Sequence, residues 1–278
     1  ALAAPASAHD DQAASPTAAA APAPSGPDGA TPLGQLAVPP ATAESYVLIS
    51  TAGQHGTAAR WRDANGGSLF RESMNLRGQV FEQDTRISTD TAGRVTSYVN
   101  RGFTPNGNAA ETYSWQDGVA RWSSPVDHGE APSDGTRLYS SFGGPFMAAA
   151  DFAERVVAAP DHRLTLLPGG EARAEQIATA MVGGNEIQLW AVNGLSLSAF
   201  PVWMDEGKFY AITSWVALMP ASSSGEMARL LQVKEEAMAR RNPAFVERFG
   251  QMPTTPTAFE HVRLFDSLQG TWLEDQTV

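Results

Sequence analysis

The stretch ETYSWQDGVARW, residues 111–122, predicts a β-hairpin and fixes the fold class around it. Asp-Gly between two alternating segments is typical of a two-residue type I′ turn. Such a turn places Gln116 opposite Val119 and Tyr113 opposite Trp122. In this register one face is apolar and the other is mostly polar. The apolar face carries Tyr113, Trp115, Ala120 and Trp122, and the other face carries Ser114, Gln116 and Arg121.

Strand signals extend on both sides of this hairpin. They begin near YVLIS, residues 46–50, and continue to about Ser124 with almost no helix signal. QVFEQDTRISTDTAGRVTSYVN, residues 79–100, predicts a longer hairpin that turns near residues 91–93. Both of its faces carry polar residues, so we expect it in a more solvated part of the same sheet.

A third hairpin is predicted for FPVWMDEGKFYAIT, residues 200–213. A turn at Glu206-Gly207 places Asp205 opposite Lys208 and Met204 opposite Phe209. Trp203, Tyr210 and Ile212 then occupy the second face. Because both faces carry apolar bulk, we expect this ribbon to be covered on both sides.

Three segments predict helices. PFMAAADFAERVVAA, residues 145–159, and EARAEQIATAMVGG, residues 171–184, each suit a helix of about three turns, the second stopped by its glycine pair. SSGEMARLLQVKEEAMARRNP, residues 223–243, is the strongest: Ser223 and Glu226 fit a capping box, and Pro243 is expected to end the helix. Its apolar side carries Met227, Leu230, Leu231 and Met238. The predicted class is α+β, an antiparallel sheet with a few packed helices.

The ends of the chain differ in composition from this α+β domain, which we place at residues 46–250. Residues 1–45 are rich in Ala and Pro and predict a disordered tether, with a plain linker favoured over a ligand for a proline-binding module. ALAAPASA, residues 1–8, has the small-residue pattern of a secretory cleavage site, which predicts a periplasmic or secreted protein. No apolar run approaches the roughly 20 residues of a membrane span.

Charge and cysteine content exclude several classes of function. The chain has 30 acidic and 19 basic side chains, a formal net charge of −11, and no cysteine. An acidic surface repels a phosphate backbone, so nucleic acid is not expected as a partner. The absence of cysteine excludes thiolate catalysis, thiolate zinc sites and iron–sulfur clusters within these residues.

The C-terminal region follows a Pro-containing stretch, QMPTTPT, residues 251–257, which predicts an interdomain linker. Residues 258–278 then predict a strand, a turn and the start of a second strand. Because a strand needs a neighbour for its backbone hydrogen bonds, we expect the sequence to continue in the parent protein.

VRLFDSLQGTWLEDQTV, residues 262–278, resembles the opening strand pair of metal-dependent amidohydrolases, particularly secreted imidazolonepropionase-like members. The matching features are the strand ending in Asp266, the loop with Gly270 and the second strand. YSWQDGVARWSSPVDHGE, LTLLPGGEARAEQIA and the 200–213 hairpin are similar to the accessory segment of some of these enzymes. The resemblance implies that residues 258–278 are the first strands of a truncated β-sandwich, followed by a barrel with His-x-His metal ligands.

No catalytic, cofactor-binding or metal-binding residue can be assigned from this resemblance. The five histidines, His9, His55, His128, His162 and His261, include no His-x-His pair. A binuclear site therefore cannot be built from this chain alone, although the parent enzyme is expected to use zinc or another divalent metal.

Other candidate sites have simpler explanations. Asp127, His128 and Glu130 form the densest titratable cluster and could bind a metal, but adjacent residues point in different directions, which favours a solvated loop. The glycine pairs in LPGGE, residues 167–171, and VGGNE, residues 182–186, favour turns and helix caps over a phosphate loop. SSSGE, residues 222–226, lacks the G-x-S-x-G pattern, and helix capping explains its serines.

The seven tryptophans leave two interpretations open. They fall mostly in predicted strands, where they could line a cavity for an apolar ligand, but core packing is the more common role. They are Trp61, Trp115, Trp122, Trp190, Trp203, Trp215 and Trp272.

Two functional hypotheses follow. The first is a non-catalytic N-terminal accessory region of a secreted amidohydrolase-type enzyme, with the missing barrel domain as its partner and a metal-activated water there hydrolysing an amide or cyclic C–N bond. The alternative is a free-standing periplasmic binding or carrier module for a small hydrophobic ligand. A carrier is expected to place the C-terminal strand pair in its own sheet, and an accessory region to leave it separate. A complete enzyme is disfavoured because no catalytic constellation is evident.

Overall fold

The computed structural model describes residues 26–250 and 253–278, which form antiparallel strands and two α-helices. The predicted antiparallel sheet with packed helices is thus confirmed. Within these residues the chain divides into two compact units. Unit 1 comprises residues 26–48 and 54–149, and unit 2 comprises residues 49–53, 150–250 and 253–278. The division lies inside the predicted 46–250 domain.

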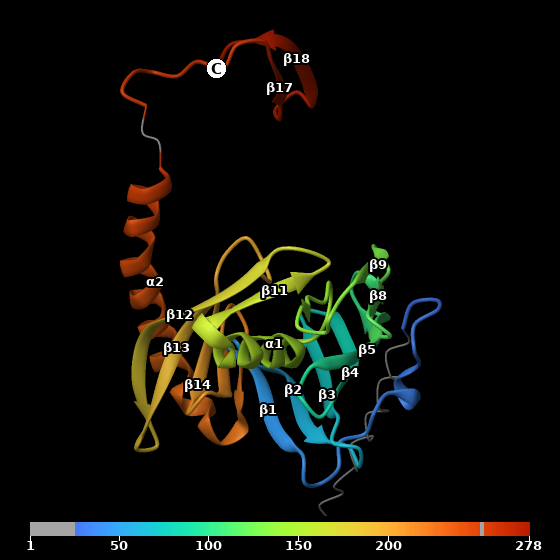
Figure 1. The fold of residues 1–278 in the computed structure, drawn as a ribbon. Coiled ribbons are helices and arrows are strands. Elements are labelled where there is room, and N and C mark those ends of the chain that lie inside the picture. The colour runs from blue at the N-terminus through green and yellow to red at the C-terminus, as the bar shows by residue number, and fades with distance from the viewer. Residues whose placement is uncertain (1–25, 251–252) are drawn as a thin grey trace, which may run out of the picture. The chain divides into compact units, whose positions relative to one another are not determined.

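Unit 1 is a sheet of antiparallel strands in the order β2-β3-β4-β5-β7-β8-β9, with β6 pairing on β5 (Figure 1). The strand bounds are β1 (Glu44–Ser50), β2 (Gly53–Arg62), β3 (Ser68–Leu76), β4 (Gln79–Thr89), β5 (Val95–Thr104), β6 (Gly107–Asn108), β7 (Glu111–Gln116), β8 (Val119–Ser123), β9 (His128–Pro132) and β10 (Leu138–Tyr139). Most successive strands are joined by short turns, as the sequence predicts for residues 46–124.

The β7–β8 hairpin has the register expected from its Asp-Gly turn. Gln116 pairs with Val119 and Tyr113 with Trp122. Tyr113 and Ala120 on the apolar face are buried, at 1% and 0% exposure. The other face is exposed. The hairpin predicted from the Asp-Gly turn and the alternating pattern is therefore confirmed.

The β4–β5 hairpin forms as predicted, but the expectation of a solvated position is wrong. Glu82 and Asp84 are 8% and 4% exposed on one face of β4, although both are carboxylates. Each accepts hydrogen bonds from an arginine on a neighbouring strand: Arg71 pairs with Glu82, and Arg101 Nε lies 2.9 Å from Asp84 Oδ1. Ion pairing allows these charges to be buried.

The opposite face of the same strands carries a buried row of polar side chains. The register places Glu72 of β3 beside Gln83 of β4, and Asn100 of β5 between Thr85 of β4 and Glu111 of β7. All five are at most 3% exposed. The Thr85 hydroxyl donates to Asn100 Oδ1 at 2.8 Å. We call this set the polar row.

The polar row holds the segment that leads into the first helix. Glu111 accepts hydrogen bonds from the Tyr139 hydroxyl at 2.7 Å and from the backbone N–H groups of Phe142 and Gly143. Gln83 Nε2 donates to the Gly143 carbonyl at 2.9 Å. Burial, together with the bond to Glu111, raises the pKa of Tyr139 well above its usual value. This segment covers the row and supplies hydrogen-bond partners to Glu111 and Gln83.

Glu72 occupies the end of the polar row, at the start of α1 (Phe146–Ala158). Its carboxyl accepts hydrogen bonds from the backbone N–H groups of Phe146 and Met147, which are unpaired donors of the helix N-terminus. Complete burial nevertheless dominates and raises the pKa of Glu72 to about 8. Its Oε2 atom has no partner within the described residues. The predicted helix at residues 145–159 is confirmed as α1.

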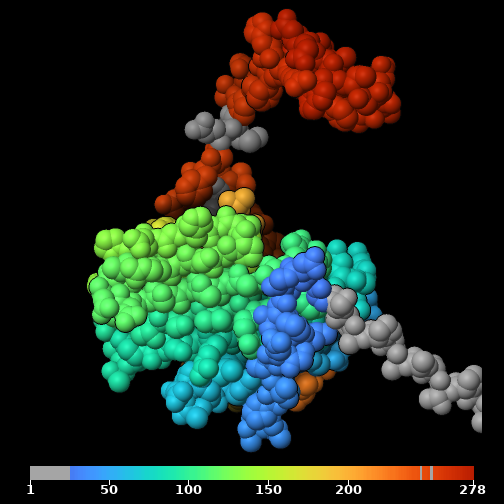
Figure 2. Space-filling model, turned by 90° about the vertical axis from the view of Figure 1, so that its right-hand side faces the viewer, coloured from blue at the N-terminus to red at the C-terminus, as the bar shows by residue number. Residues whose placement is uncertain are grey.

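Ordered structure in unit 1 begins before the expected Tyr46. A 3₁₀ helix, η1, spans Leu33–Gln35. Leu36 is 4% exposed, and the Ala37 N–H donates to Asp84 Oδ2 at 2.6 Å. Figure 2 shows this N-terminal segment, in blue, against the surface of unit 1. The first 25 residues of the predicted tether lie outside the described residues.

Unit 2 contains strands in the order β11-β12-β13-β14-β15-β16, all antiparallel (Figure 1). Their bounds are β11 (Arg163–Leu167), β12 (Glu171–Val182), β13 (Asn185–Asn193), β14 (Phe200–Asp205), β15 (Lys208–Thr213) and β16 (Ala217–Pro220). Helix α2 (Met227–Phe249) contacts β12 and β15, and two 3₁₀ helices, η2 (Pro160–His162) and η3 (Ala221–Glu226), complete the unit.

The predicted helix at residues 171–184 is wrong, because this segment forms β12. Ala, Glu and Gln favour helices in isolation, but pairing with β11 and β13 outweighs this local preference. Ile187 and Leu189 of β13 are 1% and 0% exposed, which shows that the sheet here has a well-buried face. The expected helix stop at Gly183-Gly184 is instead the turn between β12 and β13.

The β14–β15 hairpin is confirmed next to its turn, with Asp205 opposite Lys208 and Met204 opposite Phe209. The expected second face is wrong, because a bulge at Tyr210 pairs Trp203 with Ala211 and Val202 with Ile212, which puts Trp203 and Ile212 on opposite faces. The expected burial of the hairpin on both faces is confirmed. Adjacent Val202, Trp203 and Met204, whose side chains alternate between faces, are each 0% exposed. The Trp203 indole N–H donates to the Thr213 hydroxyl at 3.0 Å.

The strongest predicted helix forms as α2, but both of its predicted ends are wrong. Ser223 and Glu226 belong to η3, and no side-chain cap is formed; Glu226 instead pairs with Arg229. Pro243 lies inside the helix, which continues to Phe249. Because the surface around Pro243 is exposed, water can satisfy the carbonyl that loses its helical partner. Leu230 on the expected apolar side is 0% exposed.

The C-terminal segment contains the two expected strands, β17 (Val262–Asp266) and β18 (Thr271–Gln276). They pair with each other in a sheet of their own. Residues 253–257 of the predicted linker lie in neither a helix nor a strand, and residues 251–252 are not described. Across the described ranges, neither helix combines the length and apolar character needed to cross a bilayer.

Candidate functional site

The side chains of the predicted titratable cluster, Asp127, His128 and Glu130, do not come together around one point. Asp127 Oδ2 accepts from the Trp122 indole at 3.1 Å, and Glu130 pairs with Arg121 at 3.1 Å. His128 is exposed at the start of β9, and Glu130 lies in the same strand, so the predicted loop is wrong for these two residues. Among residues 26–250 and 253–278, no group of three His, Asp or Glu side chains is placed to hold a metal ion.

The glycine pairs and the serine cluster have structural roles. LPGGE forms the turn from β11 to β12, where the Leu166 N–H donates to the Gly170 carbonyl at 2.9 Å. VGGNE forms the turn from β12 to β13, and SSSGE lies in η3. The phosphate-loop interpretation therefore has no support from these positions.

The tryptophans are divided between core and surface. Trp203 is fully buried, whereas Trp215 and Trp272 are 64% and 53% exposed. Trp115 donates from its indole N–H to the Ser133 carbonyl at 2.9 Å. Of the seven, only Trp215 lines any of the three hollows described below.

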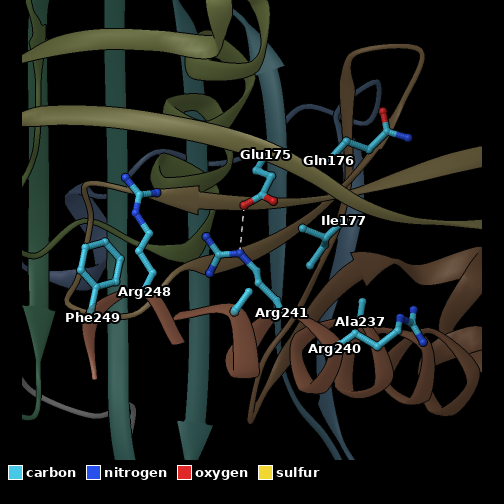
Figure 3. A pocket seen from close by; sticks show the side chains of 9 residues that line it. Glu175, Gln176, Ile177, Ala237, Arg240, Arg241, Arg248 and Phe249 are labelled. Carbon is cyan, nitrogen blue, oxygen red and sulfur yellow. Dashed lines mark hydrogen bonds and ion pairs between the residues drawn. The ribbon is translucent and has the colours of Figure 1, made fainter. Parts of the chain in front are cut away.

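A groove lies between β12 and α2 in unit 2 (Figure 3). Its first part has a volume of about 450 Å³. Arg241 and Glu175 meet across it, with Arg241 Nε 3.0 Å from Glu175 Oε2. Figure 3 shows Arg248 and Phe249 at one end of this part and Arg240 at the other.

The spacing of α2 explains how basic side chains reach the groove. Leu230 and Ala237, which are 0% and 3% exposed, define the helix side that packs on the strands. Arg241 and Arg248 follow Ala237 by four and eleven residues and lie on that same side. The Arg241 side chain is only 14% exposed. One side of α2 therefore packs on the strands through apolar residues in its first part and lines the groove with arginines in its last part.

The groove wall on β12 contains a β-bulge. Gln176 pairs with Trp190 and Ala178 with Leu189, which leaves Ile177 without an opposite residue on β13. Bulges redirect side chains and are common beside functional sites. Here Gln176 and Ile177 both line the first part of the groove.

The groove continues into a second hollow of about 410 Å³. It shares Glu175, Arg241, Arg248 and Phe249 with the first part and adds Asp161, His162, Arg163, Arg173, Ala174 and Asn193. Arg163 and Arg173 lie directly opposite each other on β11 and β12. Like charges in this arrangement repel each other.

We call the two hollows together the arginine groove. Five arginines line it against only two carboxylates, Asp161 and Glu175. Such a lining suits an anionic ligand. Sequence reasoning missed the arginine groove because a helix at residues 171–184 would not place Arg173 and Glu175 on one strand face. In the sequence, the only indication of a basic site was the Arg240-Arg241 pair followed by Arg248.

A third hollow, of about 300 Å³, lies beside Trp215. Its lining includes Ile49, Met227, Leu231 and Lys234. The Lys234 side chain is 12% exposed and its ammonium pairs with Glu235. This hollow combines apolar walls with one part-buried cation, a combination found in ligand sites.

The β17–β18 hairpin leaves apolar side chains open on both faces. Leu264 pairs with Leu273 on one face, and Phe265 with Trp272 on the other, where the two rings lie 5.0 Å apart. These four side chains are 39% to 53% exposed, and Leu268 in the turn is 96% exposed. A two-stranded sheet of this kind is only marginally stable alone.

Comparisons with known proteins find no match: no family model, no curated protein and no solved structure.

Proposed function

We propose that this chain is a non-catalytic accessory region of an amidohydrolase-type enzyme, exported to the periplasm or beyond the cell. The catalytic barrel domain is its proposed partner. In that domain, a water activated by zinc or another divalent metal would hydrolyse an amide or cyclic C–N bond. The role of the present chain is to position or shield that domain.

The β17–β18 hairpin is the observation that supports this proposal. Its two faces carry the pairs Leu264–Leu273 and Phe265–Trp272, which are all partly exposed. A hairpin on a protein surface ordinarily has one apolar and one polar face. Apolar pairs on both faces suit a strand pair that lies between other layers of a β-sandwich. This feature matches the family resemblance of residues 262–278.

Hydrogen–deuterium exchange tests whether the hairpin lacks its covering layers. In this chain the amides of β17 and β18 are expected to exchange much faster than those of β14 and β15. In the parent polypeptide with its catalytic domain, the same hairpin amides are expected to become protected.

A double substitution provides the control for that experiment. Phe265→Ser with Trp272→Ser should change the unfolding free energy of the remaining structure by no more than about 0.5 kcal/mol. Hairpin amides as protected as those of β14 and β15 in this chain would show that the faces are already covered. That result would contradict the proposal.

A binding module for a small apolar ligand is the second candidate, and the hollow beside Trp215 favours it. Apolar walls from Met227 and Leu231 surround an opening next to the part-buried ammonium of Lys234. This chemistry suits a ligand with a hydrocarbon body and one acidic end.

Calorimetric titration with dodecanoate tests this second candidate. Saturable binding with one site is expected from a carrier, and Trp215→Ala should abolish it, because the exposed indole forms part of the wall. Trp272→Ala, which removes another exposed indole from the β17–β18 hairpin, is the control and should leave binding unchanged. No heat of binding, or equal losses in both variants, would remove this candidate.

A further inference from the structure

We propose that the arginine groove is a binding site for an extended acidic peptide segment, in which several Asp or Glu side chains meet the groove arginines. This site is independent of the proposed function, since no residue of β17 or β18 lines the groove.

The charge of the groove is opposite to that of the chain. Five of the 19 basic side chains line it, whereas the chain as a whole has a formal net charge of −11. Arg241 is neutralised by Glu175, and Arg173 pairs with Glu171. Within the described part of the chain, Arg163, Arg240 and Arg248 have no carboxylate partner in the folded protein. These three side chains are available to a ligand.

The Arg163–Arg173 pair gives the clearest sign that an anion belongs in the groove. The two residues are direct partners on adjacent antiparallel strands, where like charges destabilise the pairing. Glu171 already pairs with Arg173, so Arg163 is the member of this pair that has no carboxylate. A ligand carboxylate at Arg163 would accept hydrogen bonds from its guanidinium group and reduce the remaining repulsion. Arginine is suited to this role because its planar fork binds carboxylates through two parallel hydrogen bonds.

The distribution of the arginines favours a ligand with several separate anionic groups. Arg163 and Arg173 line only the second hollow, Arg240 only the first, and Arg248 both. A single phosphate would engage one of these positions and leave the others unoccupied. Acidic side chains along an extended peptide can reach several of them together.

The aromatic residue in the groove also suits a peptide. Phe249 is 65% exposed, and the Arg248 guanidinium lies over its ring at 4.9 Å from the centroid. An apolar side chain between the acidic ones could pack on this exposed ring. A nucleic acid backbone would also present spaced anions, but the overall charge of −11 opposes its approach.

Fluorescence anisotropy with fluorescein-labelled hexaglutamate tests this proposal on the intact chain. Saturable binding at low ionic strength is expected, weakening as salt is added because the contacts are ionic. The double variant Arg163→Glu/Arg248→Glu should weaken binding by at least about tenfold, since each change removes a cation and adds an anion. Both side chains are exposed, so the fold should be retained, as checked by circular dichroism.

A matched control variant has the same change in charge at two residues that do not line the groove. Arg77→Glu/Arg121→Glu alters two exposed arginines of unit 1 and should change the affinity by less than about twofold. Equal weakening by the two double variants would show a general charge effect and overturn the proposal.

Two further outcomes would also overturn the proposal. The first is the absence of saturable hexaglutamate binding to the unchanged chain. The second is displacement of hexaglutamate by inorganic phosphate or by hexathymidylate at equal or lower concentration, which would assign the groove to phosphate or to single-stranded nucleic acid.

Discussion

The unfolding free energy of this protein is expected to fall steeply as the pH rises, and Glu72→Gln should abolish this fall. The pKa of Glu72 in the folded protein is about 8, against 4.5 for an ordinary glutamate. Between these values the folded state keeps a proton that the unfolded state has released. The unfolding free energy therefore falls as the pH rises through this range, by about 1.4 kcal/mol per pH unit where the slope is steepest. Below pH 4.5 the contribution of Glu72 is fully present, and above about pH 8 it is lost.

Glutamine keeps a side-chain oxygen that can accept from the Phe146 and Met147 N–H groups, but it cannot ionise. The stability difference between the original chain and the Glu72→Gln variant should therefore shift in favour of the variant by several kcal/mol from pH 5 to pH 8. Urea denaturation at a series of pH values measures this difference. Glu130→Gln changes an exposed glutamate and should preserve the original slope. Parallel stability curves for the original chain and Glu72→Gln would contradict the placement of Glu72 in a dry interior.

Trp203→Ala is expected to cause the largest loss of stability in unit 2. The Trp203 side chain is 0% exposed, and its indole N–H donates to the equally buried Thr213 hydroxyl. Removing the ring leaves a large cavity, which typically costs about 3–5 kcal/mol, and it also removes a partner of a buried hydroxyl. The loss should appear as a lower urea midpoint.

Two further variants separate the loss of packing from the loss of the hydrogen bond and test the effect of burial. Trp203→Phe retains most of the packing but not the hydrogen bond, so its cost should be intermediate, about 1–3 kcal/mol. Trp215→Ala removes an indole that is 64% exposed and should cost about 0.5 kcal/mol or less. Similar losses for Trp203→Ala and Trp215→Ala would contradict the burial of β14 and β15 on both faces.

The sequence predicted best where turn chemistry and alternation agree. The β7–β8 and β14–β15 hairpins have the predicted residue pairs, because Asp117-Gly118 and Glu206-Gly207 fix where each chain reverses. Their apolar residues then select the buried face. These signals are local, and they are sufficient for a short hairpin.

Features that depend on distant segments could not be predicted in this way. Residues 171–182 have the composition of a helix, and only their pairing with β11 and β13 makes them a strand. The hairpin of residues 79–100 was expected to be solvated because alternation does not reveal which segment covers a face. The arginine groove combines β11 and β12 with the second half of α2, which carries Arg240 and Arg241 and continues past Pro243 to Arg248.

The most direct test of the proposed function is the sequence of the parent transcript downstream of the codon for Val278. The proposal predicts an open reading frame that completes the β17–β18 sandwich and soon afterwards encodes a His-x-His pair on the first strand of a barrel. A stop codon directly after Val278 in the mature transcript would contradict it.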